Sequence, residues 1–184
     1  MIEFIECKTG GYRQRTIINA KSADITLAFA IDFNSSGEVL TKNAAGAHYM
    51  HIEYPLTKKW SKDDLKLLYN EFFGIINKLN LDQMHLKVNI AGHSIGGFSR
   101  FNIEQKNIDE FVLAILSYFN SYDEVQIVEI RSGGQTGADE AGAKAGEILN
   151  IKTIILAPRR WIYRNKNDDV YDDEAGFKKR FELN

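Results

Sequence analysis

Two short glycine-containing stretches carry the residues whose types and spacing are most suited to chemistry. The first is GHSIG, at Gly92–Gly96, which has the letters of the G-x-S-x-G turn that presents a nucleophilic serine in hydrolases. The second is RSGGQTGAD, at Arg131–Asp139, where an apolar run leads into glycines and then into a helical pattern. The first stretch would predict ester hydrolysis at Ser94, and the second a binding site for a phosphate group.

The serine hypothesis lacks its partner residues. In G-x-S-x-G hydrolases the general-base histidine follows the serine in the chain. All the histidines of this chain precede Ser94; they are His48, His51, His85 and His93. Residues 96–102, which begin with two glycines, also predict a loop and not the helix that such a turn requires. An esterase is therefore the less favoured interpretation, and Ser94 is instead predicted to donate a hydrogen bond to a ligand at a strand end.

The glycine loop offers the groups that bind anions. Glycines let a backbone approach a ligand closely, and the first turn of a helix presents N–H groups without intrahelical partners. The loop matches neither G-x-G-x-x-G nor a P-loop, so it specifies neither a dinucleotide nor an NTPase. Asp139 and Glu140 begin the helix, where they would either favour the helix dipole or act as a ribose acceptor and a general acid or base. Both roles stay open for Asp139, whereas the dipole role is favoured for Glu140.

Two arginine-containing segments stand at other expected element ends. YRQRT at Tyr12–Thr16 opens a helical pattern, and PRRW at Pro158–Trp161 follows an apolar run. Arginine binds phosphate through paired N–H groups, and tyrosine or tryptophan can stack on a base. A solvated charged rim is the ordinary alternative. Because both segments and Arg131 fall where strands end or helices begin, ligand binding is favoured.

An alternation of apolar runs and helical patterns must position these segments. The apolar, strand-like runs are residues 1–7, 25–31, 49–54, 86–91, 125–130 and 151–157. The helical patterns are residues 13–21, 37–45, 61–79, 108–119 and 136–149. Strands separated by helices form parallel sheets that are covered on both faces. We therefore predict an α/β, Rossmann-like fold with about six or seven parallel strands, followed by a loop or surface lid after Pro158.

Composition limits the classes of function. The 184 residues, 44% of them hydrophobic, suffice for one domain, 1–184. A net charge of −2 argues against nucleic acid or an anionic membrane as partner. The single cysteine, Cys7, excludes an intrachain disulfide, and no segment has the pattern of a signal peptide or transmembrane span, so a cytoplasmic location is expected. No metal site is predicted, and the oligomeric state, a homo-oligomer included, is left open.

Four segments together resemble the molybdenum-carrier family of the SLOG superfamily, a group of Rossmann-like nucleotide-binding proteins related to lysine-decarboxylase-like phosphoribohydrolases. Ser132–Asp139 is similar to the family's opening signature, Tyr12–Leu27 to its helix and following strand, Ser35–Thr41 to its second glycine loop, and Val88–Ser94 to its closing loop. The order is rotated here, because the segment that opens the family comes last. This resembles a circular permutation, with residues 180–184 and 1–5 expected to be neighbouring extended segments.

The resemblance implies a nucleotide-related ligand, with two departures. Glu140 stands where the family has a basic residue, and His93 lies within the family's proline–arginine pair. The related phosphoribohydrolases use a catalytic glutamate in G-G-x-G-T-x-x-E, and Glu140 has the same offset from Gly134. Cleavage of an N-glycosidic bond therefore stays an alternative, with Glu140 or Asp139 as the acid or base. A molybdenum-cofactor carrier is suggested by the family name alone.

The sequence thus predicts a module that senses or sequesters a phosphate-bearing nucleotide or nucleotide-derived signal, a small phosphorylated ligand. Backbone N–H groups of Ser132–Gly137 would hold the phosphate together with four arginines, Asp139 would orient a ribose, and Tyr12 or Trp161 would stack. The predicted ligand-binding residues are Tyr12, Arg13, Arg15, Ser36, Gly37, Thr41, Gly92, His93, Ser94, Arg131, Ser132, Gly133, Gly134, Gln135, Thr136, Gly137, Asp139, Arg159, Arg160 and Trp161.

Overall fold

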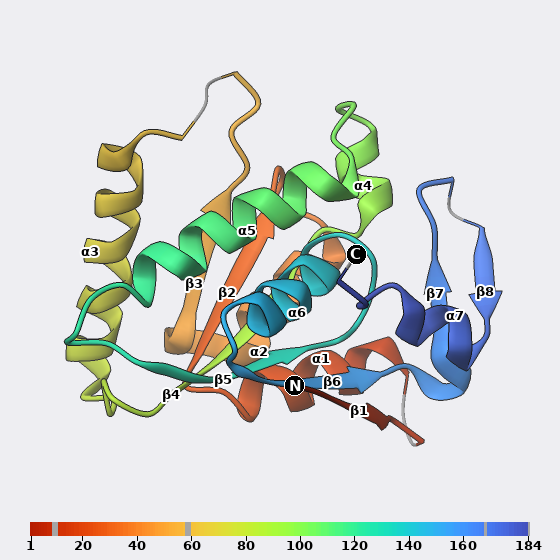
Figure 1. Cartoon of the computed structure of the whole chain (residues 1–184), viewed down its shortest axis with the longest axis horizontal. Helices are drawn as coiled ribbons and strands as arrows, with labels where there is room; N and C mark the ends of the chain where they lie inside the picture. Colours follow the sequence, from red (N-terminus) through yellow and green to blue (C-terminus); the bar gives the residue numbers. More distant parts are fainter. Residues whose placement is uncertain (9–10, 58–59, 168, 184) are drawn as a thin grey trace.

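A computed structural model describes residues 1–8, 11–57, 60–167 and 169–183. Its centre is a six-stranded parallel sheet with the strand order β1-β6-β5-β4-β2-β3 (Figure 1). The strands are β1 (Ile2–Glu6), β2 (Ile25–Ala30), β3 (Tyr49–Glu53), β4 (Leu86–Gly92), β5 (Ile127–Ser132) and β6 (Lys152–Ala157). The predicted α/β, Rossmann-like architecture is confirmed, and the N-terminal strand lies at an edge beside β6.

Helices cover both faces of this sheet. They are α1 (Tyr12–Lys21), α2 (Ser36–Ala45), α3 (Lys62–Leu79), α4 (Ile95–Ser99), α5 (Gln105–Phe119), α6 (Ala138–Ile148) and α7 (Glu174–Lys179), with a 3-10 turn, η1 (Gly46–His48), before β3. Helices α1 and α2 pack together on one face, and α5 and α6 pack together on the other, with α3 beside α5 (Figure 1). Among the described helices, none combines the length and apolar character that a membrane span requires.

The core explains why the central strands read as continuous apolar runs. Every residue of β2 is buried, as expected for a strand covered on both faces. The rings of Phe72 on α3 and Phe119 on α5 stack with centroids 4.6 Å apart. Helix α6 lies close to the sheet because its glycines leave room, and a Cβ atom at Gly142 would meet the side chain of Ile90 on β4. The small side chains of α6 thus allow the helix to pack tightly on the sheet.

The strand order creates a crevice at the carboxyl ends of the central strands β2 and β4. From β2 the chain passes through α2 to β3 on one side, and then returns through α3 to β4 on the other side of β2. The helix that follows β2 lies on one face, whereas α5, which follows β4 after the short α4, lies on the other (Figure 1). The loops after these neighbouring strands therefore diverge, and open α/β sheets bind ligands at such a point.

Two sequence expectations are wrong. Residues 96–102 are predicted to form a loop, but α4 begins directly after Ser94, whose carbonyl accepts the N–H groups of Gly97 and Phe98. The buried side chains of Ile95 and Phe98 compensate for the poor helix propensity of the glycines between them.

The segment after Pro158 is more regular than the expected loop or lid. It forms a 3-10 turn, η2 (Arg159–Trp161), then an antiparallel hairpin of β7 (Ile162–Arg164) and β8 (Val170–Asp172), and then α7. Phe177 of α7 is fully buried and anchors the segment. The chain ends meet as expected, with the rings of Phe4 and Phe181 5.6 Å apart, but residues 180–183 are not a strand, and Asn184 lies outside the described residues.

Replacing Gly92 with alanine should destabilise the fold. Gly92 has a φ of +144°, and a Cβ atom there would overlap the carbonyl oxygen of Phe29 on β2. We expect the free energy of unfolding to fall by about 2–4 kcal/mol, since a backbone atom of the sheet cannot rotate away. Gly74→Ala is the matched control, because Gly74 is exposed in α3 with open space around it, and this change should add roughly 0.5–1 kcal/mol. Urea unfolding followed by circular dichroism measures both; equal effects would contradict the prediction.

Candidate functional site

A cleft with a volume of about 1130 Å³ opens where the carboxyl ends of β2 and β4 diverge. Its walls come from the first turns of α1 and α2, the GHSIG loop, the glycine loop before α6, and the β7 region. Many of the residues predicted to bind a ligand line it: Tyr12, Arg15, Gly37, Thr41, Gly92, His93, Ser94, Gly133, Gln135, Asp139 and Arg159. The fold therefore brings together segments that are far apart in the sequence.

Other predicted residues lie away from the cleft. Arg13 and Ser36 are exposed on their helices, and Arg131 pairs with Glu129 two residues earlier, at 3.0 Å between Nη1 and Oε1. Ser132, Gly134, Thr136 and Gly137 are buried inside the loop and outside the cleft lining.

The basic segment after β6 is also divided. Arg159 lines the cleft, whereas Arg160 pairs with Asp172 on β8. The ring of Trp161 lies 5.5 Å from that of Phe177, in the small apolar cluster beside β1 and β6. Trp161 is therefore a packing residue and not the expected stacking platform.

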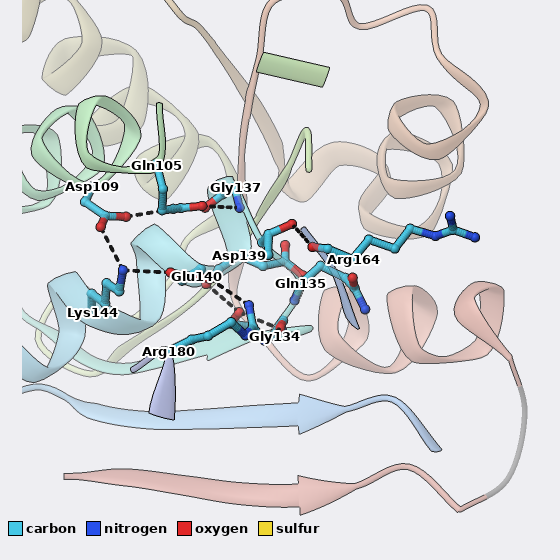
Figure 2. A network of polar contacts seen from close by, with 12 residues as sticks. Gln105, Asp109, Gly134, Gln135, Gly137, Asp139, Glu140, Lys144, Arg164 and Arg180 are labelled. Carbon is cyan, nitrogen blue, oxygen red and sulfur yellow. Dashed lines mark hydrogen bonds and ion pairs between the residues drawn. The ribbon is translucent and has the colours of Figure 1, made fainter. Parts of the chain in front are cut away.

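The backbone N–H groups of the glycine loop are largely bonded within the protein, so the expected amide cradle for phosphate is wrong in that form. The N–H of Gly134 donates to Ser132 Oγ at 3.1 Å, and that of Gln135 to Asp139 Oδ2 at 3.3 Å. The N–H of Gly137 donates to Gln105 Oε1 at 2.7 Å (Figure 2). The glycines of this loop therefore allow a tight turn in which the N–H groups reach side-chain oxygens of the protein.

Glu140 is a structural residue, and its contacts do not favour the alternative role of a catalytic acid or base. Its carboxylate accepts from Lys144 Nζ and from Arg180 Nη1, each at 2.7 Å (Figure 2). Arg180 also donates to the carbonyl of Gly134 at 2.7 Å, and its guanidinium lies 4.3 Å from the ring centroid of Tyr163. Glu140 thus ties the C-terminal segment to the glycine loop on the α5 side of α6, away from the cleft.

Asp139, the neighbouring residue, points the other way, into the cleft. Its carboxylate accepts the N–H of Gln135, and its own carbonyl accepts from Ser132 Oγ at 2.7 Å. Burial raises the pKa of Asp139 to about 6, against the opposing effect of the Arg15 charge. A carboxyl group that titrates near neutrality inside a cleft can act as a hydrogen-bond acceptor or exchange a proton with a ligand.

Glu38 is a cleft residue that the sequence analysis missed. It lies in the first turn of α2 and is only 3% exposed, and its Oε2 has no hydrogen-bond partner among the described residues. Burial raises its pKa to about 7, with a further rise from the charges of Asp139 and Asp32. Ser35-x-x-Glu38 is the pattern of a solvent-facing capping box, and Ser35 does accept the Glu38 N–H at 3.3 Å. The sequence pattern therefore gives no sign that the Glu38 carboxyl group turns into the cleft.

The remaining charges of the cleft are mostly cationic and exposed. Arg100, Arg159, Arg164 and Lys166 line its outer parts, whereas Arg15 is buried deeper beside Asp139. The first turn of α1, including Gly11 and Tyr12, also lines the cleft, without an acidic residue or a capping side chain. The cleft therefore combines buried carboxyl groups inside with a basic entrance.

The geometry at Ser94 does not favour a nucleophile. Ser94 has ordinary extended dihedral angles, φ −66° and ψ 165°, as the residue before α4, and lacks the strained turn of a nucleophile elbow. His93 Nε2 donates to the carbonyl of Asp32 at 2.8 Å, so this ring is directed toward the β2 loop. Within the described ranges, no group of three or more His, Cys, Asp or Glu side chains is placed to hold a metal ion.

Comparison with protein-family models, curated proteins and solved structures found no match to this chain.

Removal of the Glu140 side chain should affect stability and leave the cleft intact. Glu140→Ala leaves two partly buried cations, Lys144 and Arg180, without this carboxylate, and we expect a loss of about 2–4 kcal/mol of unfolding free energy. Glu110→Ala removes an exposed partner of Lys106, 3.9 Å away, and should cost less than about 1 kcal/mol. Urea unfolding compares the two; similar losses would show that the Glu140 network is not a stabilising one.

The pKa of Glu38 predicts a pH-dependent stability. The folded state keeps the Glu38 proton up to about pH 7, whereas the unfolded chain releases it near 4.5, so stability falls as pH rises between these values. Glu38→Gln removes this cost and should gain on the order of 2–3 kcal/mol relative to the unmodified chain between pH 4.5 and 8. Unfolding measured at both pH values tests this, with Glu71→Gln on the exposed face of α3 as the baseline. A stability difference between Glu38→Gln and the unmodified chain that was the same at both pH values would contradict the prediction.

Proposed function

We propose that this protein binds a phosphorylated nucleoside in the cleft between β2 and β4. The observation that carries the proposal is the division of charge within one cleft, with exposed cations at the entrance and buried acceptors inside. A nucleotide has the complementary division, because its phosphate is anionic and its sugar and base carry O–H and N–H donors. The volume of about 1130 Å³ is sufficient for a ligand of this size.

The phosphate end would lie near the start of α1 and Arg159. Gly11, the residue before helix α1, has no side chain to cap the helix, so the first N–H groups of α1 and the positive end of its dipole favour an anion. Arg159 and Arg100 add side chains that can bind phosphate through paired N–H groups. In this arrangement the anion is held by α1 and arginines, in place of the amides of the glycine loop.

The nucleoside end would lie toward Asp139 and Glu38. Tyr12 is about half exposed, at 53%, and lines the cleft, so its ring is available for stacking on a base. Asp139 would accept a ribose hydroxyl, as the sequence analysis expected. The resemblance to nucleotide-binding SLOG proteins supports this orientation.

The packing of Phe181 on Phe4 supports the proposed circular permutation, because it places the two ends of the chain side by side.

Cleavage of an N-glycosidic bond is a second candidate function. It is favoured by two carboxyl groups in one cleft whose pKa values burial raises, Asp139 to about 6 and Glu38 to about 7. Near neutral pH one of them can stay protonated and donate to a departing base while the other accepts a proton from water. Glu140 has no part in this candidate mechanism because its carboxylate is engaged by Lys144 and Arg180.

Arg159 should contribute to nucleotide affinity. We expect Arg159→Ala to weaken binding of a nucleoside 5′-monophosphate by about tenfold, measured by isothermal titration calorimetry. A hydrogen bond to a charged group contributes about 1.5–3 kcal/mol, and the contribution of an exposed arginine lies at or below the lower end of this range. Arg13→Ala is the matched control, since Arg13 is an exposed arginine of α1 outside the cleft lining. Equal losses from the two variants, or no binding by the unmodified chain, would count against the proposal.

Incubation with nucleoside monophosphates, followed by chromatography for free base, separates binding from hydrolysis. Recovery of intact nucleotide by a chain that binds it supports the binding module. If base is released, Asp139→Asn should abolish the release and Glu140→Gln should leave turnover per folded molecule unchanged, because Asp139 lines the cleft and Glu140 is absent from its lining. Turnover that depended on Glu140 in the folded variant would overturn this assignment of roles.

A further inference from the structure

The inner part of the cleft holds two buried acceptors that lack hydrogen-bond partners among the described residues. Glu38 on α2 and Asn19 on α1 are each only 3% exposed, and both line the cleft. Glu38 Oε2 and Asn19 Oδ1 are buried and have no hydrogen-bond partner among the described residues. A buried acceptor without a partner costs about 1–3 kcal/mol, so two of them on helices that pack together call for a ligand group that satisfies them.

Two donors of the cleft lining are already used by the protein. The Thr41 hydroxyl donates to the carbonyl of Gly37 at 3.0 Å. The amide of Asn89 on β4 donates through Nδ2 to Thr26 Oγ1 at 3.2 Å. The inner surface is therefore suited to a group that donates hydrogen bonds, and its carboxyl groups exclude the phosphate from this end.

We infer that Glu38, together with Asn19, forms a subsite that determines ligand specificity by accepting hydrogen bonds from two adjacent donors on the nucleoside. This inference rests on the proposed function. A carboxylate has two oxygens that can each accept one donor of such a pair. Two parts of a nucleoside have this chemistry: the N–H groups of a guanine base edge and the 2′- and 3′-hydroxyls of ribose.

Three nucleotides distinguish these two sources in calorimetric titrations. GMP carries both donor pairs, 2′-deoxy-GMP keeps the base edge and loses the diol, and AMP keeps the diol and loses the paired N–H groups. If Glu38 accepts from the base, GMP and 2′-deoxy-GMP should bind alike, and AMP at least tenfold more weakly. If it accepts from the ribose, GMP and AMP should bind alike, and 2′-deoxy-GMP at least tenfold more weakly. A site built around buried acceptors discriminates against ligands that leave them unpaired.

Glu38→Gln tests the residue itself. The glutamine amide places a donor where the ligand also donates, so the variant should lose at least tenfold in affinity for the preferred nucleotide and lose most of the discrimination. Asn19→Ala is a second variant that removes the other acceptor and should weaken the same nucleotide. Glu71→Gln on α3 is the matched control. Inhibition of binding by inorganic pyrophosphate should be unchanged in Glu38→Gln and weaker in Arg159→Ala.

The outcomes separate this inference from the proposed function. If none of the three nucleotides binds, the proposed function is overturned, and the inference with it. If nucleotides bind but the three affinities are equal, or if folded Glu38→Gln keeps the affinities of the unmodified chain, the subsite is overturned and the proposed function stands. A thermal melt of each variant without ligand verifies folding before titration.

Discussion

The backbone of His93 joins the three segments that form the cleft. Its N–H donates to the carbonyl of Phe29 at the end of β2, at 3.0 Å, and its carbonyl accepts the N–H of Ala138 at the start of α6, also at 3.0 Å. Its ring reaches the carbonyl of Asp32 in the β2 loop. The close approach depends on glycine on both sides, because a Cβ atom at Gly92 would overlap the Phe29 carbonyl, and one at Gly137 the His93 carbonyl. These constraints place the wall of the cleft before any ligand enters.

The same constraints change what the glycine loop can do. A loop between a strand and a helix has unpaired N–H groups that could hold phosphate. In this protein Asp139, Ser132 and Gln105 take those N–H groups, and Ala138 is bonded to His93. The loop is bonded within the protein, and under the proposed function the start of α1 and the arginines of the cleft would attract the anion.

Two buried carboxyl groups, those of Glu140 and Glu38, differ in whether they have partners within the protein. Glu140 is buried and paired with two cations, an arrangement that stabilises the junction of α6 with the C-terminal segment. Glu38 is equally buried, but its Oε2 has no partner among the described residues, which costs stability. A cost of this kind, next to a cleft, is more readily explained by ligand recognition than by folding.

The sequence by itself determined the alternation of strands and helices, because each element depends mainly on neighbours within a few residues. It also placed Tyr12, Arg15 and Asp139 at the ends of elements that meet in one cleft. The tertiary structure alone decided that Asp139 faces the cleft while adjacent Glu140 faces Arg180. Successive residues of a helix point about 100° apart, so their roles depend on partners up to 40 residues away. Whether Glu38 points outward or inward was decided in the same way, since its surroundings come from α1, α6 and the β2 loop.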